Sequence, residues 1–382
     1  MSSIEPFRIA VSDAEVADLR TRLHDARWPD QLPDSGWDYG ADYEYLKPLA
    51  RYWADGYDWR AHEAALNRFP GYITEIDGQR IHFLHVRSPH EGALPLVLTH
   101  GWPGSISEFE HCIAALVDPV AHGGMASDAF HVVVPSLPGY GWSGPTHETG
   151  WNVRRTAAAW AELMARLGYA RYGAQGGDWG SFVTRHLADL DPSHVCGVHV
   201  NMMTATPPGN ADDNDDLSPR EIAQQARTQE YFTTGSGYVA IQSTRPQTLA
   251  YGLNDSPIGL LSWIIEKFWA WSDNDGHPEQ AVSRDDLLTN VSIYWFTQTA
   301  GSSARMYYES IKSHAVSPPN ITAVPVGIGW YPDEIMMARR RWIEATNNVV
   351  YWNEADRGGH FAAMEEPDLF VDDVRSFFRL VR

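Results

Sequence analysis

The sequence has few cysteines, few cations and no long apolar segment. Cys112 and Cys196 are the only cysteines among 382 residues, which argues against a disulfide framework or a cysteine metal site and favours a reducing compartment. No apolar run approaches the roughly 18 residues of a membrane-spanning helix, and the N-terminus lacks the basic and apolar regions of a signal peptide. We therefore expect a cytoplasmic protein with no membrane partner.

The charge is strongly unbalanced toward acid. Lys and Arg number 29 against 49 Asp and Glu, a formal net charge of −20. Such a surface repels phosphate backbones and anionic lipid, so the sequence predicts no nucleic acid partner. With 43% hydrophobic and 20% charged residues, the composition is that of a globular protein, and the length suits one large domain with an added module.

The middle of the chain alternates short apolar runs with helical patterns. Continuous apolar runs are typical of strands buried on both faces of a parallel sheet. The runs include 94–100, 130–135 and 195–200, and the helical patterns 105–117, 153–167 and 181–189. Two β-rich runs before them meet at Asp77-Gly78, a hairpin signal. This order predicts an α/β fold with right-handed crossovers.

Two regions depart from this alternation. The first 70 residues favour helices, beginning with a capping box of Ser12 and Glu15. From 204 to 318 the strand pattern gives way to helix-like runs such as IGLLSWIIEKFWAW, and strands resume near 322. We therefore expect a helical N-terminal extension over 1–70, an α/β core over 71–203 and 319–382, and a helical cap over 204–318.

The segment Gly176-Gly177-Asp178-Trp179-Gly180 lies between a strand-like and a helix-like run. In α/β-hydrolases this is the place of the nucleophile elbow, a sharp turn that needs small neighbours. The elbow usually carries Ser, whereas this chain has Asp178. The alternative is an aspartate that caps a helix after a glycine-rich turn.

Two further segments fit the same fold. A strand ends in His100-Gly101-Trp102-Pro103-Gly104, where a tight loop can turn a backbone N–H toward a developing oxyanion; an ordinary Pro-Gly turn is the alternative. His360 follows a Gly-Gly loop after the last strand-like run. A lone histidine is usually structural, but His360 comes last, as the triad order of nucleophile, acid and histidine requires. Asp333 and Glu334 both follow a strand and are candidates for the acid.

The motifs HGWPG, GGDWG, NDSPIG, YPDEI and GGHFAAMEEP, in this order, resemble the microsomal-type epoxide hydrolases of the α/β-hydrolase superfamily. Because no anchor helix precedes them, the chain resembles the soluble bacterial branch. The resemblance implies an α/β-hydrolase fold with a mostly parallel sheet, an inserted cap, a helical N-terminal extension and no cofactor or metal. It also implies a small-molecule epoxide and water as the reactants.

The resemblance also implies roles for single residues. Asp178 would be the nucleophile, His360 the base and Glu334, at the last position of an aromatic-Pro-x-Glu motif, the acid in preference to Asp333. Two cap tyrosines would activate the epoxide, Tyr238 and Tyr307, with Tyr308 as an alternative to Tyr307. The backbone N–H groups of Trp102 and Trp179 would form the oxyanion hole.

These residue types suit the reaction. A carboxylate that attacks saturated carbon forms an ester, which water can cleave, whereas serine would form an ether. Tyrosines, with a usual pKa of about 10, can hydrogen-bond the ring oxygen and protonate it. The aromatic cap suggests a bulky aryl or polycyclic epoxide, in detoxification or secondary metabolism; its aromatic residues are Tyr231, Phe232, Trp263, Phe268, Trp269 and Trp271. The oligomeric state stays open, with a homodimer as one possibility.

Other functions fit less well. Haloalkane dehalogenases also use Asp-Trp at the elbow, but they need halide-binding groups and no tyrosine pair. A serine esterase needs Ser there, and a non-catalytic binding protein on this fold normally shows a broken triad. His62-Glu63 has no second histidine four residues on, and no Walker or Rossmann motif occurs. The acidic loop lacks the EF-hand spacing, which favours a solvated loop over a calcium site; its acids are Asp212, Asp213, Asp215 and Asp216.

Overall fold

The computed structural model describes residues 3–207, 216–317 and 320–382, and its centre is a twisted, mostly parallel sheet. In this described part the strand order is β1-β2-β3-β5-β4-β6-β7-β8-β9. Pairing is antiparallel from β1 through β3 to β5 and parallel from β5 to β9. The strands are β1 Glu5–Phe7, β2 Gly71–Ile76, β3 Gln79–Val86, β4 Leu94–Thr99, β5 Phe130–Pro135, β6 Tyr172–Gly176, β7 Val195–Val200, β8 Val326–Trp330 and β9 Val349–Glu354.

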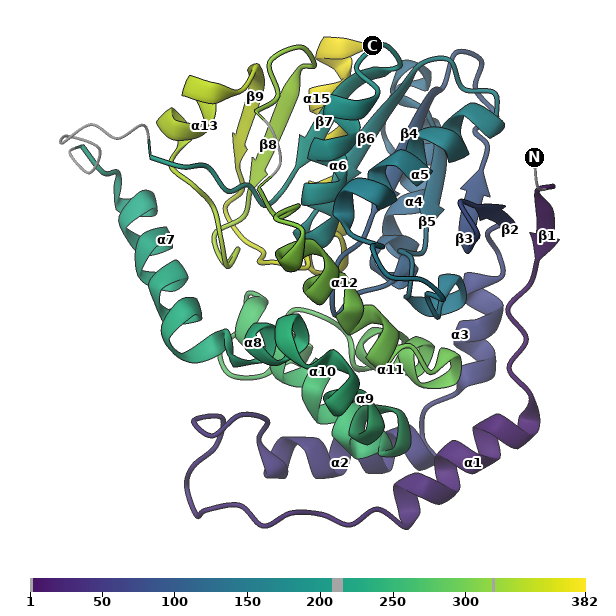
Figure 1. Cartoon of the computed structure of the whole chain (residues 1–382), viewed down its shortest axis with the longest axis vertical. Coiled ribbons are helices and arrows are strands. Elements are labelled where there is room, and N and C mark those ends of the chain that lie inside the picture. The colour runs from purple at the N-terminus through teal and green to yellow at the C-terminus, as the bar shows by residue number, and fades with distance from the viewer. Residues whose placement is uncertain (1–2, 208–215, 318–319) are drawn as a thin grey trace.

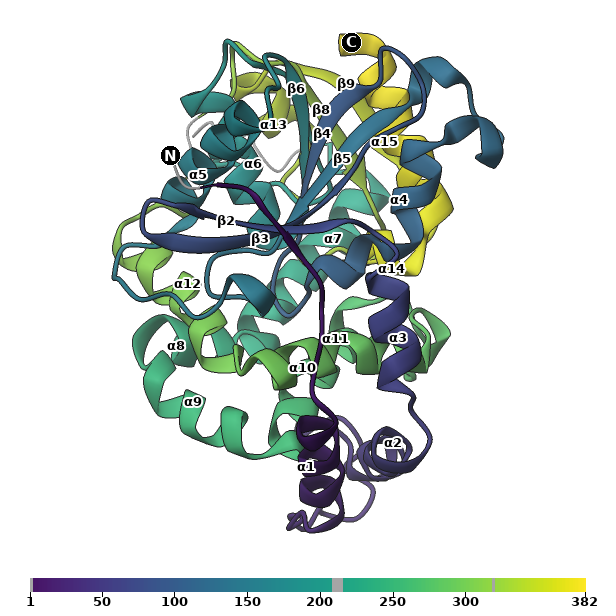
Figure 2. The same ribbon diagram turned by 90° about the vertical axis from the view of Figure 1, so that its right-hand side faces the viewer.

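The α/β fold expected from the apolar runs is confirmed. Leu96, Val97 and Leu98 in the central strand β4 are fully buried, because helices cover both faces of the sheet. Figures 1 and 2 show α4 (Glu110–Val117) and α15 (Pro367–Val381) on one face, and α5 (Val153–Arg166) and α6 (Asp178–Leu190) on the other. Two short helices complete this part, α13 (Arg340–Thr346) and α14 (Ala362–Glu365).

The hairpin expected at Asp77-Gly78 is also present. Both residues have positive φ, +51° and +73°, as a type I′ turn requires. The hairpin joins β2 to β3 in full register from Ile76 opposite Gln79 to Gly71 opposite Leu84.

Helices make up most of the described residues between β7 and β8, and they gather below the carboxyl ends of the parallel strands (Figure 1). They are α7 Pro219–Glu230, α8 Gly237–Thr244, α9 Pro246–Asp255, α10 Pro257–Trp271, α11 Arg284–Thr297 and α12 Ala300–Lys312. Asp212, Asp213 and Asp215 of the acidic loop lie outside the described residues. Among the residues that are described, no cluster of three His, Cys, Asp or Glu could hold a metal ion, and none of the helices is long and apolar enough to cross a membrane.

The first 70 residues are not helical throughout. The expected helices are present as α1 (Asp13–His24), α2 (Tyr43–Asp55) and α3 (Trp59–Leu66), and the capping box of α1 is formed. The prediction missed β1, whose residue Phe7 pairs with Gly71 of β2. Three residues with a central proline carry no alternating pattern, and their partner lies more than sixty positions away in the sequence. The extension therefore runs from the sheet edge to the outer side of the cap (Figure 1).

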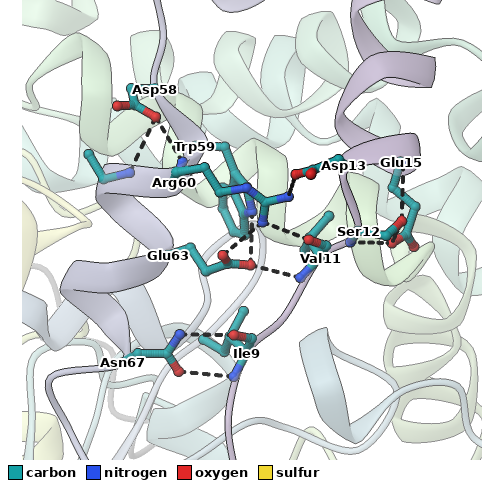
Figure 3. Close-up of polar contacts among 11 residues, drawn as sticks. Ile9, Val11, Ser12, Asp13, Glu15, Asp58, Trp59, Arg60, Glu63 and Asn67 are labelled. Atoms are coloured by element: carbon teal, nitrogen blue, oxygen red, sulfur yellow. Dashed lines mark hydrogen bonds and ion pairs between the residues drawn. The ribbon is translucent and has the colours of Figure 1, made fainter.

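The arm between β1 and α1 is fixed to α3 by side chains that bind its backbone (Figure 3). Asn67 bonds Ile9 twice, accepting from its N–H at 2.9 Å and donating to its carbonyl at 2.9 Å. Glu63 accepts from the N–H of Val11 at 2.7 Å, and Arg60 donates to the Val11 carbonyl at 2.6 Å. These bonds replace the strand or helix partners that an extended segment lacks.

We expect Asn67→Ala to lower the free energy of unfolding by about 1–3 kcal/mol, because it leaves the N–H and carbonyl of the buried Ile9 without partners. Urea denaturation monitored by circular dichroism measures this change. Gln229→Ala, which removes an exposed amide on α7, is the matched control and should cost less than about 0.5 kcal/mol. Equal losses in the two variants would show that the Asn67 bonds do not hold the arm.

Candidate active site

Asp178 lies in a strained turn between β6 and α6. Its φ is +47°, a left-handed conformation that a non-glycine residue rarely adopts. The turn needs glycine on both sides: a Cβ on Gly176 would lie 2.2 Å from the carbonyl oxygen of Gly180, and one on Gly180 would lie 1.9 Å from that of Thr99. The capping position of α6 belongs to Gly177. The structure therefore supports the elbow and excludes the alternative of a capping aspartate.

The HGWPG loop after β4 packs directly against this turn. The backbone N–H of Trp102 donates to Oδ1 of Asp178 at 2.7 Å, as expected of an oxyanion-hole donor. Gly101 allows the approach, because a Cβ there would lie 2.3 Å from the Asp178 carboxylate. Trp179 follows Asp178 in α6, but its N–H makes no such bond to Asp178 in this structure, and its oxyanion role stays a prediction.

His360 lies between Glu334 and Asp178 and contacts both carboxylates. Its Nδ1 lies 2.7 Å from Oε1 of Glu334, and its Nε2 lies 3.3 Å from Oδ2 of Asp178. The His360 and Glu334 side chains are almost completely buried. Burial alone disfavours the imidazolium, but the charge of Glu334 and the contacts with Asp178 outweigh it and raise the pKa of His360 well above its usual value. The three side chains form an ion-pair chain of the kind that a triad requires.

The structure distinguishes the two candidate acids. Glu334 faces His360 and also accepts the N–H of Ile335 at 2.8 Å, which fixes the carboxylate. The Asp333 carboxylate instead pairs with Arg227 of α7. The geometry therefore favours Glu334, as the motif alignment does.

No pattern in the sequence indicates that α7 holds the loop of Glu334. Gln224 of α7 donates to the carbonyl of Glu334 at 2.9 Å and accepts from the indole of Trp330 at 3.1 Å. Thr228, one turn further on, donates to the carbonyl of Ile335 at 3.0 Å. Polar residues four positions apart on a helix look like a solvated face in the sequence, so only their tertiary partners reveal this role.

The cap brings three tyrosine hydroxyls toward the elbow. Tyr238 and Tyr307 are both buried, and their rings meet edge to face at 5.8 Å. Tyr307 also packs on Trp179, and Tyr238 stacks on Trp102 at 4.9 Å. Trp179 of the elbow and Trp102 of the HGWPG loop therefore hold the tyrosine pair in place.

The third hydroxyl belongs to Tyr231, and its surroundings differ from those of Tyr308, the alternative to Tyr307. The Tyr231 hydroxyl lies 2.9 Å from that of Tyr238, a contact that the sequence did not reveal. Tyr308 turns away from Tyr307 and takes a hydrogen bond from Lys312 at 3.2 Å near the surface. Of the two register choices, the structure therefore brings Tyr307 to the site.

The side chains of Tyr238 and Tyr307 are suited to donate a hydrogen bond or a proton from the uncharged phenol. Burial first, and then the nearby negative charges, Asp178 among them, raise the pKa of both Tyr238 and Tyr307 well above the usual value. The phenols stay protonated at neutral pH and can donate to an oxygen that gains charge.

Asp178 opens onto a cavity of about 550 Å³. Its lining is Asp178, Trp179, Phe182, Met202, Thr204, Tyr231, Phe232, Ser236, Tyr238, Val239, Ala240, Tyr307, Ile311, Val316, Ile335 and Met336. Among these described residues Asp178 is the only charged one. The cavity is therefore suited to an uncharged, largely apolar molecule.

Only part of the aromatic cap lines this cavity. Tyr231 and Phe232 do, whereas Trp271 packs edge to face on His360 at 5.2 Å. Phe268 stacks on Phe361, and Trp269 stacks on Trp37 of the N-terminal extension. Most of the cap aromatics therefore serve packing, not substrate contact.

Comparison with known protein families agrees with this geometry. Residues 4–109 match the family described as the epoxide hydrolase N terminus, and residues 95–251 match the alpha/beta hydrolase fold. Epoxide hydrolase 1 of Sus scrofa is 36% identical over 99% of this chain and 89% of its own length. A Stigmatella aurantiaca protein, itself only provisionally assigned as an epoxide hydrolase, is 50% identical over 99% of this chain and 86% of its own length.

Solved structures extend the similarity to the whole fold. The Aspergillus niger epoxide hydrolase superposes with a TM-score of 0.88 at 34% identity, covering 100% of this chain and 97% of the other. The juvenile hormone epoxide hydrolase of Bombyx mori gives 0.92 at 30% identity, covering 100% and 95%. With the elbow aspartate, its histidine and acid, and the facing tyrosines in place, this chain belongs to the microsomal-type epoxide hydrolases of the α/β-hydrolase fold.

Proposed function

We propose that the chain converts an epoxide to a vicinal diol through a covalent ester on Asp178. One observation carries the proposal: the Asp178 carboxylate and the Tyr238 and Tyr307 side chains line the same apolar cavity. An epoxide between them meets a nucleophile at carbon and proton donors at oxygen. The remaining triad members, His360 and Glu334, lie behind the carboxylate, where the second step needs them.

In the first step an oxygen of Asp178 bonds to an epoxide carbon while the carbon–oxygen bond of the ring breaks. The ring oxygen takes a proton from Tyr238 or Tyr307, and a tyrosinate remains. Oδ1 of Asp178 accepts the short bond from the Trp102 N–H, whereas Oδ2 makes only the longer contact of 3.3 Å with Nε2 of His360, so Oδ2 is the less constrained oxygen. The product is a hydroxyalkyl ester of Asp178.

In the second step water cleaves this ester. Once Asp178 is esterified its negative charge is gone, so one of the interactions that raise the pKa of His360 is lost. The imidazolium then gives its proton to the tyrosinate, and the neutral imidazole can accept a proton from water. The water oxygen attacks the carboxyl carbon of Asp178, and the Trp102 N–H stabilises the oxyanion. The ester bond breaks, the diol oxygen takes the proton from His360, and the proton on the restored carboxyl passes to His360, which returns the site to its starting state.

The size and apolar lining of the cavity support a bulky or aromatic epoxide, in detoxification or in secondary-metabolite biosynthesis. A volume of about 550 Å³ lies within the usual range for sites that bind small organic molecules. A cytoplasmic location and a homodimer stay predictions.

We expect one turnover in water labelled with heavy oxygen to put the label into the Asp178 carboxylate and leave the first diol largely unlabelled, because water attacks the ester carbonyl. Mass spectrometry of the peptide that contains Asp178 and of the diol measures both. Label found directly in the diol after a single turnover would exclude the ester.

We expect Glu334→Gln to slow ester hydrolysis by about 100-fold or more, since the buried His360 loses its anionic partner. Asp333→Asn should have a much smaller effect, because its carboxylate pairs with Arg227. Rapid-quench kinetics of ester formation and decay compare the two variants, which differ by one position in the same loop. The reverse order of effects would move the acid to Asp333.

We expect Tyr238→Phe and Tyr307→Phe each to slow ring opening by about 10–1000-fold, since each hydroxyl donates to the developing alkoxide. The double change should nearly abolish ring opening, and hydrolysis of a preformed ester should change much less. Tyr308→Phe is the adjacent control and should leave the rate of alkylation near that of the parent enzyme. Near-normal alkylation by both single variants, with folding intact, would reject the pair.

A further inference from the structure

A second, much smaller chamber lies on the other side of the Asp178 carboxylate. It shares only Asp178 with the described lining of the large cavity, and it is enclosed by the HGWPG loop, the end of β6 and the loop of His360. It offers about 10 Å³ to the centre of a water-sized sphere, which is room for about one water molecule.

Polar side chains that lack partners line this chamber. Gln175 donates to Oδ1 of Asn201 at 3.0 Å, but its Oε1 is buried without a hydrogen bond. Nε2 of His360 is likewise buried without a well-aligned bond, although it lies 3.3 Å from Asp178. A small chamber with several such groups is the kind of site that an ordered water occupies.

Glu108 brings a carboxyl group to the same chamber. It lies in a single 3₁₀ turn, Ile106–Phe109, and its carboxyl packs so closely on Gly104 that any Cβ there would overlap it. It takes a hydrogen bond from the N–H of Gly101, and burial followed by the charge of Asp178 raises its pKa to about 8. At neutral pH the group is therefore mostly protonated, and can both donate and accept.

The triad does not need Glu108 as its acid. Glu334 already holds Nδ1 of His360 at 2.7 Å, so a second carboxyl near the ring has no orienting role to fill. A buried carboxyl is costly unless it has partners. Its place beside Gln175 and His360 is explained if all three bind one polar molecule.

We propose that Glu108 and Gln175 position the hydrolytic water in this chamber, next to Nε2 of His360 and behind the carboxyl carbon of Asp178. The inference rests on the proposed ester mechanism and adds where its second reactant is bound. The water gives one proton to Nε2 of His360, and its oxygen forms the new bond to the carboxyl carbon. Epoxide and water thus reach Asp178 from separate cavities, and a bulky ester in the large cavity does not displace the attacking water.

The test separates ester formation from ester hydrolysis by rapid-quench kinetics and intact-protein mass spectrometry, with an aryl epoxide as the probe. In Glu108→Met, which keeps the length but removes both polar functions, we expect hydrolysis to fall about 100-fold and alkylation to stay within about threefold. Glu108→Gln can still donate and accept, so its hydrolysis should stay within about tenfold of the parent. Gln175→Leu, which removes the other polar side chain, should also slow hydrolysis alone, by about tenfold.

Glu110→Gln is the matched control: its carboxylate belongs to the adjoining helix, pairs with Arg68 and does not line the chamber, so both steps should keep parent rates. Parent-like ester hydrolysis in Glu108→Met and Gln175→Leu would overturn the proposal, and so would an equal fall of both steps, which marks a merely structural role. Failure of the ester mechanism itself would look different, because no ester would then accumulate even in His360→Gln.

Discussion

The backbone of Asp178 is the constraint on which the site depends. A left-handed conformation at a residue with a side chain costs about 1–3 kcal/mol, and at φ +47° Asp178 is held there by close packing on every side. At Gly176, Gly180 and Gly101, even a single methyl group would overlap neighbouring atoms. The strained turn sets the carboxylate between two cavities, so that one face meets the substrate space and the other meets His360.

In the proposed mechanism, the charge of Asp178 changes between the two chemical steps, and the pKa of His360 changes with it. In the free enzyme His360 lies between two carboxylates, which raise the pKa of its imidazole in spite of burial. In the proposed mechanism, alkylation removes the charge of Asp178, and His360 then faces Glu334 alone. Formation of the ester bond would therefore also lower the pKa of His360 before the second step. The low dielectric of the buried site enlarges this change in pKa.

The parts of the site that could be predicted are those carried by short motifs. Asp178 and His360 stand in glycine-rich loops whose chain order already indicates their roles, and the choice of Glu334 followed from its place in the aromatic-Pro-x-Glu motif. The choice between Tyr307 and Tyr308 could not be made, because the rotation of α12 about its axis is set by what it packs against. The apolar runs likewise predicted strands β4 to β7, since strands buried on both faces have a signature of their own.

Features without a local signature could not be predicted. Strand β1 depends on a partner far along the chain, and the cap aromatics look alike in sequence although few reach the cavity. Glu108 follows the HGWPG motif by four residues, and only the backbone N–H groups of that motif were predicted to have a function. An acid between Ser107 and Phe109 in a turn that becomes buried is an informative signal, because it must find partners or change its protonation state.

The cap contributes to the triad as well as to substrate binding. Gln224 of α7 holds the carbonyl of Glu334, and the N–H of His360 donates to the last residue of α10 at 2.9 Å. Asn290 of α11 donates to the carbonyl of Pro103 in the HGWPG loop at 2.7 Å. Each of the three loops that approach Asp178 is therefore bonded to a different cap helix. Because catalytic groups must be held to within fractions of an ångström, these bonds make the cap and the sheet one unit. The N-terminal extension packs on the outer side of the cap and supports the same unit.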